Sequence, residues 1–355
     1  MNQDEKYMAR CIQLAQNGRH HASPNPMVGA VIVCDGKIIG EGYHIRCGEA
    51  HAEVNAIRSV KDESLLKRST IYVSLEPCSH YGKTPPCADL IISKGIPRVV
   101  IGCVDPFSKV SGRGIEKLRQ AGIVVIVGVL QDECLQLNKR FIISNTQQRP
   151  YVILKWAQSS DGYIDSLRDT PDQPPVCFSN AFTSMLVHKQ RAEVDAILVG
   201  RRTALLDNPS LTVRHWPGRS PLRVVIDRNL SLPKHLALFD GENPTLVFTA
   251  QSIYPKVKGV EYCTLDFSHS ILPDLLKELH HRGVQSLLVE GGATLLQSFI
   301  DEGYWDEAHV EVSTTVLETG VPAPMLHSVS CEYSNHFGHI KKIYRHSSSQ
   351  TRSCH

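Results

Sequence analysis

The stretch that decides the fold of the first half of the chain is HAEVNAIRSVKDESLLKRSTIYVSLEPCSHYGKTPPC, residues 51–87. Its start, HAEVNAIRSV, has the apolar spacing of a helix, and TIYVSL at 70–75 is typical of a buried β-strand. Alternation of helices with strands predicts a layered α/β domain. The same stretch contains His51, Cys78 and Cys87, so it also contains the first candidates for chemistry.

Elements on both sides of this stretch extend the α/β pattern. Apolar residues at helical spacing, Met8, Cys11, Ile12 and Ala15, predict a helix over residues 5–17. The other predicted elements are a hairpin of strands at 28–33 and 37–40 around Asp35-Gly36, helices at 86–95 and 114–122, strands at 98–104 and 124–129, and one helix with a polar connector at 131–150.

The alternation begins again after residue 147. Strands are predicted at 151–157, 195–200, 223–227, 245–250, 286–292 and 308–313, with helices at 180–192, at 271–282 and after 293. At roughly 150 residues per domain, a chain of 355 residues is long enough for two domains. We therefore expect two α/β domains, 1–147 and 148–355.

Composition excludes several classes of function. Lysine and arginine total 38 against 36 acidic residues, a net charge of +2, so bulk charge does not indicate a nucleic-acid or membrane surface. The chain has no apolar run near the roughly 20 residues that span a bilayer, and its amphipathic start does not resemble a signal peptide. We expect a cytoplasmic protein whose 11 cysteines are mostly reduced thiols.

His51, Cys78 and Cys87 have the composition of a catalytic zinc site. One imidazole and two thiolates leave the fourth position of a tetrahedral zinc ion for water, whose pKa zinc lowers to roughly 7. Glu53 lies two residues after His51, at the expected first turn of a helix, where it can reach the same pocket and transfer protons. A closed structural zinc site, or no metal, is the alternative.

The pattern H-x-E, then P-C and a further cysteine, resembles the zinc nucleobase deaminases. HAEVNAI together with PCSHYGKTPPC is more specific, and resembles the bifunctional riboflavin-biosynthesis deaminase/reductase family over nearly the whole chain. The eight residues between the cysteines are typical of that family and favour a small nucleotide substrate. The resemblance implies a cytidine-deaminase-like first domain, a dihydrofolate-reductase-like second domain, one zinc ion per chain, and NADPH.

The resemblance implies a diaminohydroxypyrimidine substrate with a phosphoribosylamino group, which the first domain deaminates. Asn25, His44 and Asp105 are its implied contacts, with His80 and Lys83 in the loop between the cysteines suited to a phosphate. The structural alternatives are a turn for Asn25, a strand-end histidine for His44, and solvated surface for His80 and Lys83. The family's asparagine two positions after Asp105 is replaced here, which puts one polar contact in doubt.

The second half has no G-x-G-x-x-G after a strand, so it needs another nicotinamide-binding scaffold. In SLLVEGGATLLQSFI, a strand, two glycines and a helix start suit phosphate binding, although a plain tight turn explains the glycines equally well. The resemblance assigns the cofactor to Gln158, Ser179, Thr203, Asp207, Gly292, Ala293 and Thr294, and the substrate to Lys155, Arg191, Leu211, Arg214 and Glu290.

These reductase assignments have structural alternatives. Arg191 and Arg214, expected to converge on one phosphate, could be surface arginines, and Glu290 could cap the following helix. The chain also departs from the family at Cys177-Phe178-Ser179, at Ser160 and after Val312, positions where the resemblance implies an effect on cofactor preference or hydride transfer.

The sequence therefore predicts a bifunctional enzyme that deaminates the pyrimidine nucleotide with zinc and reduces its ribose to ribitol with NADPH. Two other functions stay open: a nucleic-acid-editing zinc deaminase, and a zinc-stabilised scaffold with a degenerate reductase half. Neutral charge and the eight-residue loop oppose nucleic acid as a partner. A small phosphorylated pyrimidine is the expected partner, no membrane is expected, and homo-oligomerisation is left open.

Overall fold

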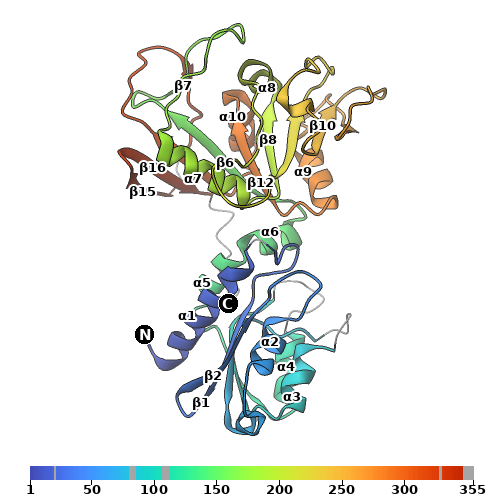
Figure 1. Cartoon of the computed structure of the whole chain (residues 1–355), viewed down its shortest axis with the longest axis vertical. Helices are drawn as coiled ribbons and strands as arrows, with labels where there is room; N and C mark the ends of the chain where they lie inside the picture. The colour runs from blue at the N-terminus through green and yellow to red at the C-terminus, as the bar shows by residue number, and fades with distance from the viewer. Residues whose placement is uncertain (20, 80–84, 106–111, 328–329, 347–355) are drawn as a thin grey trace. The chain divides into compact units, whose positions relative to one another are not determined.

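The structure is a computed structural model that describes residues 1–19, 21–79, 85–105, 112–327 and 330–346 (Figure 1). Contacts within the chain divide it into two compact units, Met1–Gln148 and Arg149–His355. The boundary expected from the sequence lies one residue from this division.

Unit 1 is built on a five-stranded sheet with the order β2-β1-β3-β4-β5. Strand β1 is antiparallel to β2 and β3, whereas β3, β4 and β5 are parallel. The elements are α1 (Gln3–Ala15), η1 (Gln16–Gly18), β1 (Gly29–Cys34), β2 (Lys37–Tyr43), α2 (Ala52–Arg58), η2 (Glu63–Arg68), β3 (Thr70–Leu75), α3 (Cys87–Ser93), β4 (Arg98–Cys103), α4 (Arg113–Gln120), β5 (Val124–Val127), α5 (Gln131–Leu137) and α6 (Lys139–Gln147).

Helices cover both faces of this sheet, which makes unit 1 a three-layer structure (Figure 1). On one face, Ile32 and Ile71 pack with side chains of α2, α3 and α4. On the other face, Val31 packs with Met8 and Cys11 of α1 and with residues of α5. The alternation of Val31 and Ile32 between the two cores is the period-two pattern of a strand buried on both sides.

Close packing positions helix α2, which contains Glu53, against strand β2. A Cβ on Gly42 would lie 2.3 Å from the backbone nitrogen of Ala56 and 2.6 Å from the carbonyl oxygen of Ala52. Only a glycine therefore lets the backbone of the helix approach the strand this closely.

The prediction of a single helix with a polar connector within 131–150 is wrong, because the structure has two helices there. Helices α5 and α6 are separated at Asn138, whose buried side chain turns toward the backbone of Met27 instead of extending a helix. The Asn138 amide accepts the Met27 N–H at 2.8 Å and donates to the Met27 carbonyl at 2.9 Å. A long-range pair of hydrogen bonds thus decides where the helix ends.

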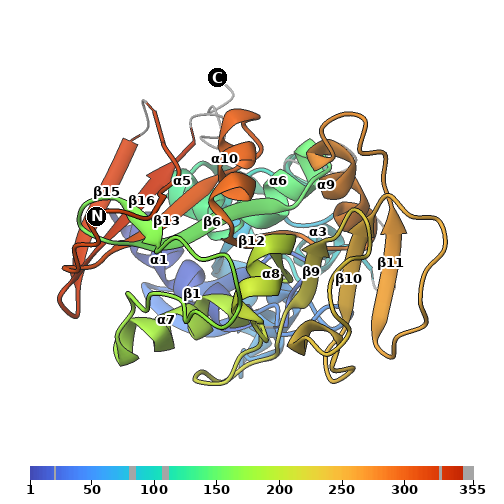
Figure 2. The ribbon, with the colours of Figure 1, turned by 90° about the horizontal axis from the view of Figure 1, so that it is seen from above.

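Unit 2 is built on a nine-stranded sheet with the order β11-β10-β9-β8-β12-β6-β13-β16-β15 (Figure 2). Neighbours from β11 to β13 are parallel, and β16 and β15 continue the sheet antiparallel. The elements are β6 (Tyr151–Gln158), β7 (Tyr163–Asp165), α7 (Ala181–Ala192), β8 (Ala196–Gly200), α8 (Arg201–Asp207), β9 (Leu222–Ile226), η3 (Ala237–Phe239), β10 (Thr245–Thr249), β11 (Val260–Thr264), α9 (Leu272–His281), β12 (Ser286–Gly291), α10 (Ala293–Asp301), β13 (Glu307–Val312), β14 (Val321–Pro322), β15 (Ser330–His336) and β16 (His339–Arg345).

The parallel strands of unit 2 are nearly continuous apolar runs because helices cover the sheet. Val152, Leu154, Leu198, Val224 and Leu287 belong to one buried cluster with side chains of α9 and α10. Strands β15 and β16 were not predicted, since β15 is almost wholly exposed and lacks an apolar face. No helix among the described residues is long and apolar enough to cross a membrane.

Candidate functional site

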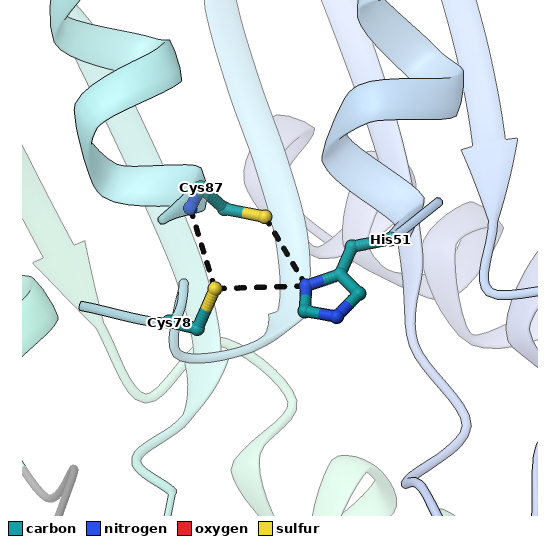
Figure 3. Close-up of side chains that lie close together, drawn as sticks. All are labelled: His51, Cys78 and Cys87. Carbon is teal, nitrogen blue, oxygen red and sulfur yellow. Dashed lines mark hydrogen bonds between the residues drawn. The ribbon is translucent and has the colours of Figure 1, made fainter. Parts of the chain in front are cut away.

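Three side chains from separate elements of unit 1 meet as a metal-binding group (Figure 3). His51 is the N-cap of α2, Cys78 follows β3, and Cys87 is the first residue of α3. His51 Nδ1 lies 3.5 Å from Cys78 Sγ and 3.3 Å from Cys87 Sγ. Because their donor atoms all lie within 4.8 Å of one another, the residues fit one zinc ion with a fourth position left over.

The start of α3 also stabilises the thiolate of Cys78. The Cys87 backbone N–H donates to Cys78 Sγ at 3.3 Å. Hydrogen bonds from Cys87, and then from His51, lower the pKa of the Cys78 thiol to about 4 even though burial opposes the shift. A cysteine in this environment is a thiolate at neutral pH, and the thiolate is the form that binds a metal cation.

Glu53 lies in the first turn of α2, as the sequence predicts, and only 3% of its surface is exposed. Burial, and next the neighbouring Cys78 thiolate, raise the pKa of Glu53 to about 7, while His51 acts in the opposite direction. A carboxyl group with a pKa near 7 can both accept and donate a proton at neutral pH.

A cavity of about 370 Å³ joins these groups to the predicted substrate contacts. Asn25 Nδ2 lies 3.1 Å from Nε2 of the buried His44, whose Nδ1 lies 3.2 Å from the carbonyl oxygen of Ala50. Burial lowers the pKa of His44, so a neutral ring that donates from Nδ1 and accepts at Nε2 fits both contacts. The residues that line the cavity are Asn25, Pro26, Val28, His44, His51, Glu53, Leu75, Glu76, Cys78, Asp105, Phe141 and Asn145.

The structure thus brings Asn25, His44 and Asp105 to the cavity of the metal-binding group. His80 and Lys83 lie outside the described residues, as does Phe107. Sequence reasoning missed Glu76, Phe141 and Asn145. The spacing of Phe141 and Asn145, four residues apart on one helix, was an available signal for a shared face, but not for which cavity that face would line.

Unit 2 has a larger cavity, of about 1040 Å³, at the carboxyl ends of its parallel strands. Gly292 has a φ of +68° and no side chain, so a ligand can approach the backbone there. A Cβ at this position would lie 3.3 Å from Thr203 Oγ1. Its size and bare backbone fit a large cofactor such as NADPH. The predicted residues that line it are Lys155, Ser179, Thr203, Asp207, Glu290, Gly292, Ala293 and Thr294.

Some polar groups in this cavity are already paired. Ser179 Oγ donates to Glu311 Oε2 at 2.8 Å, and Asp207 pairs with the buried Arg168. Arg168 lines the cavity together with other arginines that sequence reasoning missed: Arg201, Arg202 and Arg228. This positive lining suits a ligand with several phosphate groups.

Gln158, Leu211, Arg191 and Arg214 are not among the residues that line this cavity. Gln158 Oε1 accepts a hydrogen bond from the Trp156 indole at 2.8 Å, and Leu211 is buried. The two arginines meet at Thr212: Arg191 Nη1 donates to its carbonyl at 3.3 Å, and Arg214 Nη1 to its hydroxyl at 3.1 Å.

The alternative role of Glu290 as a helix cap is wrong, because Gly292 is the N-cap of α10. Arg191 instead donates to both carboxylate oxygens of Glu290, from Nε at 3.0 Å and from Nη2 at 2.6 Å. Burial by itself would raise the pKa of Glu290, but Arg191, with a smaller contribution from Lys155, holds it below its usual value. With 13% of its side chain exposed, Arg191 is therefore a largely buried ion-pair partner and not a surface arginine.

Comparison with known proteins decides the family. The chain is 40% identical to the riboflavin biosynthesis protein RibD of Aquifex aeolicus over 90% of this chain and 89% of that protein. It is 38% identical to RibD of Escherichia coli, with 89% of each covered. The chain belongs to the RibD family. RibD members join a deaminase domain to a reductase domain, so this chain is a bifunctional enzyme of riboflavin biosynthesis.

Domain models and solved structures agree with membership of the RibD family. The cytidine and deoxycytidylate deaminase zinc-binding region matches residues 1–103, and the RibD C-terminal domain matches residues 150–320. A diaminohydroxyphosphoribosylaminopyrimidine deaminase/5-amino-6-(5-phosphoribosylamino)uracil reductase from Thermotoga maritima has a TM-score of 0.87, at 37% identity over 97% of this chain and 98% of that one. RibD of Acinetobacter baumannii has a TM-score of 0.83, at 32% identity over 97% of this chain and 98% of that one.

These findings confirm the cytidine-deaminase-like and dihydrofolate-reductase-like domains predicted for this RibD chain. Zinc belongs to the first domain and NADPH to the second. The findings support the bifunctional enzyme and neither of the two alternatives, the nucleic-acid-editing deaminase and the scaffold.

Proposed function

We propose that unit 1 removes the C2 amino group of 2,5-diamino-6-(5-phosphoribosylamino)pyrimidin-4-one as ammonia, and that unit 2 reduces the ribose of the product to ribitol. The observation that carries the first step is the buried Glu53 beside the group of His51, Cys78 and Cys87, all four lining or adjoining one cavity. Water replaces the amine in this reaction, which leaves a ring carbonyl and ammonia.

His51, Cys78 and Cys87 hold zinc in this proposal. When bound, zinc acidifies a water molecule and so supplies a nucleophile near neutral pH. Glu53 would carry the two protons of the attacking water in turn, the first to the ring nitrogen and the second to the departing amino group, a role for which a pKa of about 7 is suited. Asn25, His44 and Asp105 orient the substrate, and His80 and Lys83 contact its phosphate.

In unit 2, NADPH supplies the hydride when it is bound. The proposed cofactor contacts are Gln158, Ser179, Thr203, Asp207, Gly292, Ala293 and Thr294, of which all but Gln158 line the large cavity. Lys155 and Glu290 line the same cavity, where they orient the ribose, while Leu211, Arg191 and Arg214 hold the phosphate end of the substrate. Arg191 contributes through Thr212, which it shares with Arg214.

We also propose that the enzyme acts in the cytoplasm, on a free nucleotide and not on nucleic acid. The near-neutral net charge of +2 supports a small-molecule partner over a polyanion.

The test separates the two reactions. Purified enzyme is incubated with the diaminopyrimidine nucleotide, first without NADPH while ammonia is measured, and then with NADPH while absorbance at the reduced nicotinamide band is followed. We expect ammonia release without NADPH and NADPH oxidation only after deamination. Ammonia release from a nucleic acid but not from the nucleotide would contradict the proposal.

A further inference from the structure

The side chain of Glu76 lines the deaminase cavity. Glu76 is 4% exposed, and among the described residues four backbone N–H groups donate to its carboxylate. Oε2 accepts from the N–H of Asp105 at 3.3 Å and of Gly112 at 3.0 Å. Oε1 accepts from the N–H of Gly114 at 2.9 Å and of Ile115 at 3.4 Å.

These bonds join three parts of unit 1 that are far apart in the sequence. Glu76 directly precedes the Pro77-Cys78 turn, Asp105 follows β4, and Gly112 to Ile115 form the start of α4. The backbone N–H of Glu76 also donates to the carbonyl of Cys103 at 3.0 Å. Side chain and backbone of one residue therefore connect the metal-binding turn to the end of the neighbouring strand.

Packing at α4 allows this connection and requires a glycine. A Cβ on Gly114 would lie 2.1 Å from the carbonyl oxygen of Pro77 and 3.2 Å from Glu76 Oε1. The helix start therefore lies directly against the turn that carries Cys78. A carboxylate is the side chain that suits this place, because it offers acceptors only, and its charge strengthens bonds to backbone N–H groups.

We propose that Glu76 is a positioning residue of the deaminase: it fixes Asp105 relative to the metal-binding turn, so that Asp105 can hold the pyrimidine in the cavity. This inference rests on the proposed role of Asp105. Glu76 acts through the backbone and does not touch the reacting atoms. A glutamine would place an NH₂ group against N–H donors, so the amide should break part of the network while keeping the size of the side chain.

The test begins with Glu76→Gln in the full chain. We expect the KM of the diaminopyrimidine nucleotide to rise about tenfold or more, with kcat changed much less, because a misplaced Asp105 weakens binding. Zinc content per chain and NADPH oxidation on pre-deaminated substrate should equal those of the wild type. The matched control is Glu116→Gln, which removes an exposed carboxylate from the same helix. A loss of zinc together with kcat, and no change in KM, would overturn the proposal.

A double-mutant cycle with Asp105→Ala separates positioning from a general structural effect. We expect Glu76→Gln to raise KM less than twofold in the Asp105→Ala background, because a residue that acts through Asp105 loses its effect with it. Full multiplication of the two effects overturns the role of Glu76 but leaves that of Asp105. An unchanged KM in Asp105→Ala alone overturns the assignment of Asp105, and the proposal with it. If Glu76→Gln does not fold, Glu76→Asp, whose shorter side chain cannot reach all four donors, takes its place in the cycle.

Discussion

At the scale of single residues, the structure gives Glu53 the environment that proton transfer needs. Glu53→Gln preserves the shape of the side chain but cannot take up or deliver a proton, so we expect deamination to fall on the order of 100-fold or more. Zinc content should stay at the wild-type value, because Glu53 is not one of the metal-binding group. Ammonia release and metal analysis of the same sample check both points. Glu49→Gln, which removes an exposed carboxylate four residues upstream, is the control; near-normal ammonia release from Glu53→Gln would exclude its role.

Arg214 is the cleaner test of phosphate recognition in unit 2. Its guanidinium is exposed and bonded to Ser210 and Thr212, so Arg214→Ala removes the proposed phosphate contact without opening the core. Loss of a charge-assisted hydrogen bond costs about 1.5–3 kcal/mol, so we expect KM for the reductase substrate to rise roughly 10- to 150-fold. KM for NADPH should stay within about twofold. Steady-state kinetics measure this, with Arg219→Ala as control. Wild type should discriminate strongly against dephosphorylated substrate, and Arg214→Ala should discriminate much less.

Arg191 needs a different interpretation from Arg214. Removing its guanidinium leaves the buried carboxylate of Glu290 without a partner, and breaking a buried ion pair costs about 3–5 kcal/mol. In an Arg191→Ala variant, a loss of stability would therefore accompany any loss of substrate binding, and kinetics alone would not separate the two. If Arg214→Ala instead raises KM for NADPH and leaves KM for the reductase substrate unchanged, the proposed phosphate role of Arg214 is wrong.

His188 predicts how the stability of unit 2 depends on pH. Burial, and then the charges of Arg191, Arg214 and His215, lower its pKa to about 4, while Glu290 opposes the shift. Its unfolded value is 6.5, so the unfolded state binds more protons between those two values, and the free energy of unfolding falls as pH drops from 6.5 toward 4. Nδ1 of the neutral ring accepts a hydrogen bond from the backbone N–H of Arg214 at 3.1 Å, and protonation of Nδ1 removes this bond.

Thermal melts at several pH values between 7 and 4.5 measure this effect. The transition of unit 2 is the one that added NADPH shifts upward. We expect its midpoint to fall on acidification in the wild type, and to fall less in His188→Gln than in the control His235→Gln, where an exposed ring is removed. Equal slopes for both variants would show that His188 does not titrate between the two states.

At the scale of elements, the break between α5 and α6 holds the loop that carries Asn25. Asn138→Ala removes both hydrogen bonds to Met27 and leaves the partly buried N–H and carbonyl of Met27 without that partner, which costs about 1 kcal/mol. We expect a lower melting temperature for unit 1 and a higher KM for the deaminase substrate. Calorimetry and kinetics test this, with Gln136→Ala on the exposed side of α5 as control. An unchanged KM would mean that the loop holds Asn25 in place without this bond.

The elements show where periodicity works as a guide and where it does not. The helix predicted at 5–17 appears as α1 and η1, and its predicted apolar face is buried at Met8, Cys11 and Ala15. The single helix predicted within 131–150 is two helices in the structure, because apolar spacing continues on both sides of Asn138, whose side chain bonds to the distant backbone of Met27. Strand β15 was not predicted because it has no buried face and therefore no apolar period. Its pairing with β16 holds it in the sheet.

At the scale of the whole molecule, the metal-binding group found among the described residues belongs to unit 1. Removing zinc with a chelator should therefore abolish ammonia release while NADPH oxidation on pre-deaminated substrate continues. Cys87→Ser should act in the same direction and also destabilise unit 1, because binding of the metal is linked to folding of its site. Metal analysis, both assays and re-addition of zinc test this. Loss of both activities on chelation would show that the two units depend on one metal.

The sequence by itself determined the chemistry and most of the elements. Metal binding and proton transfer require particular residue types at particular places in the chain. The sequence therefore identifies His51, Glu53, Cys78 and Cys87, which lie at the starts of helices or just after a strand. The helices and buried strands followed from apolar periods of 3.6 and 2. These signals are local, so one stretch of chain contains them.

Only the tertiary structure decided which polar groups meet. The pair of Arg191 with Glu290 joins residues 99 positions apart, and the bonds of Asn138 to Met27 join residues 111 apart. The amide partners of Glu76 lie 29 to 39 residues away. A buried polar side chain must find a partner, but any of many backbone groups can satisfy it, and the choice depends on how sheets and helices pack. No local period encodes that choice, which is why these contacts were found only in the folded chain.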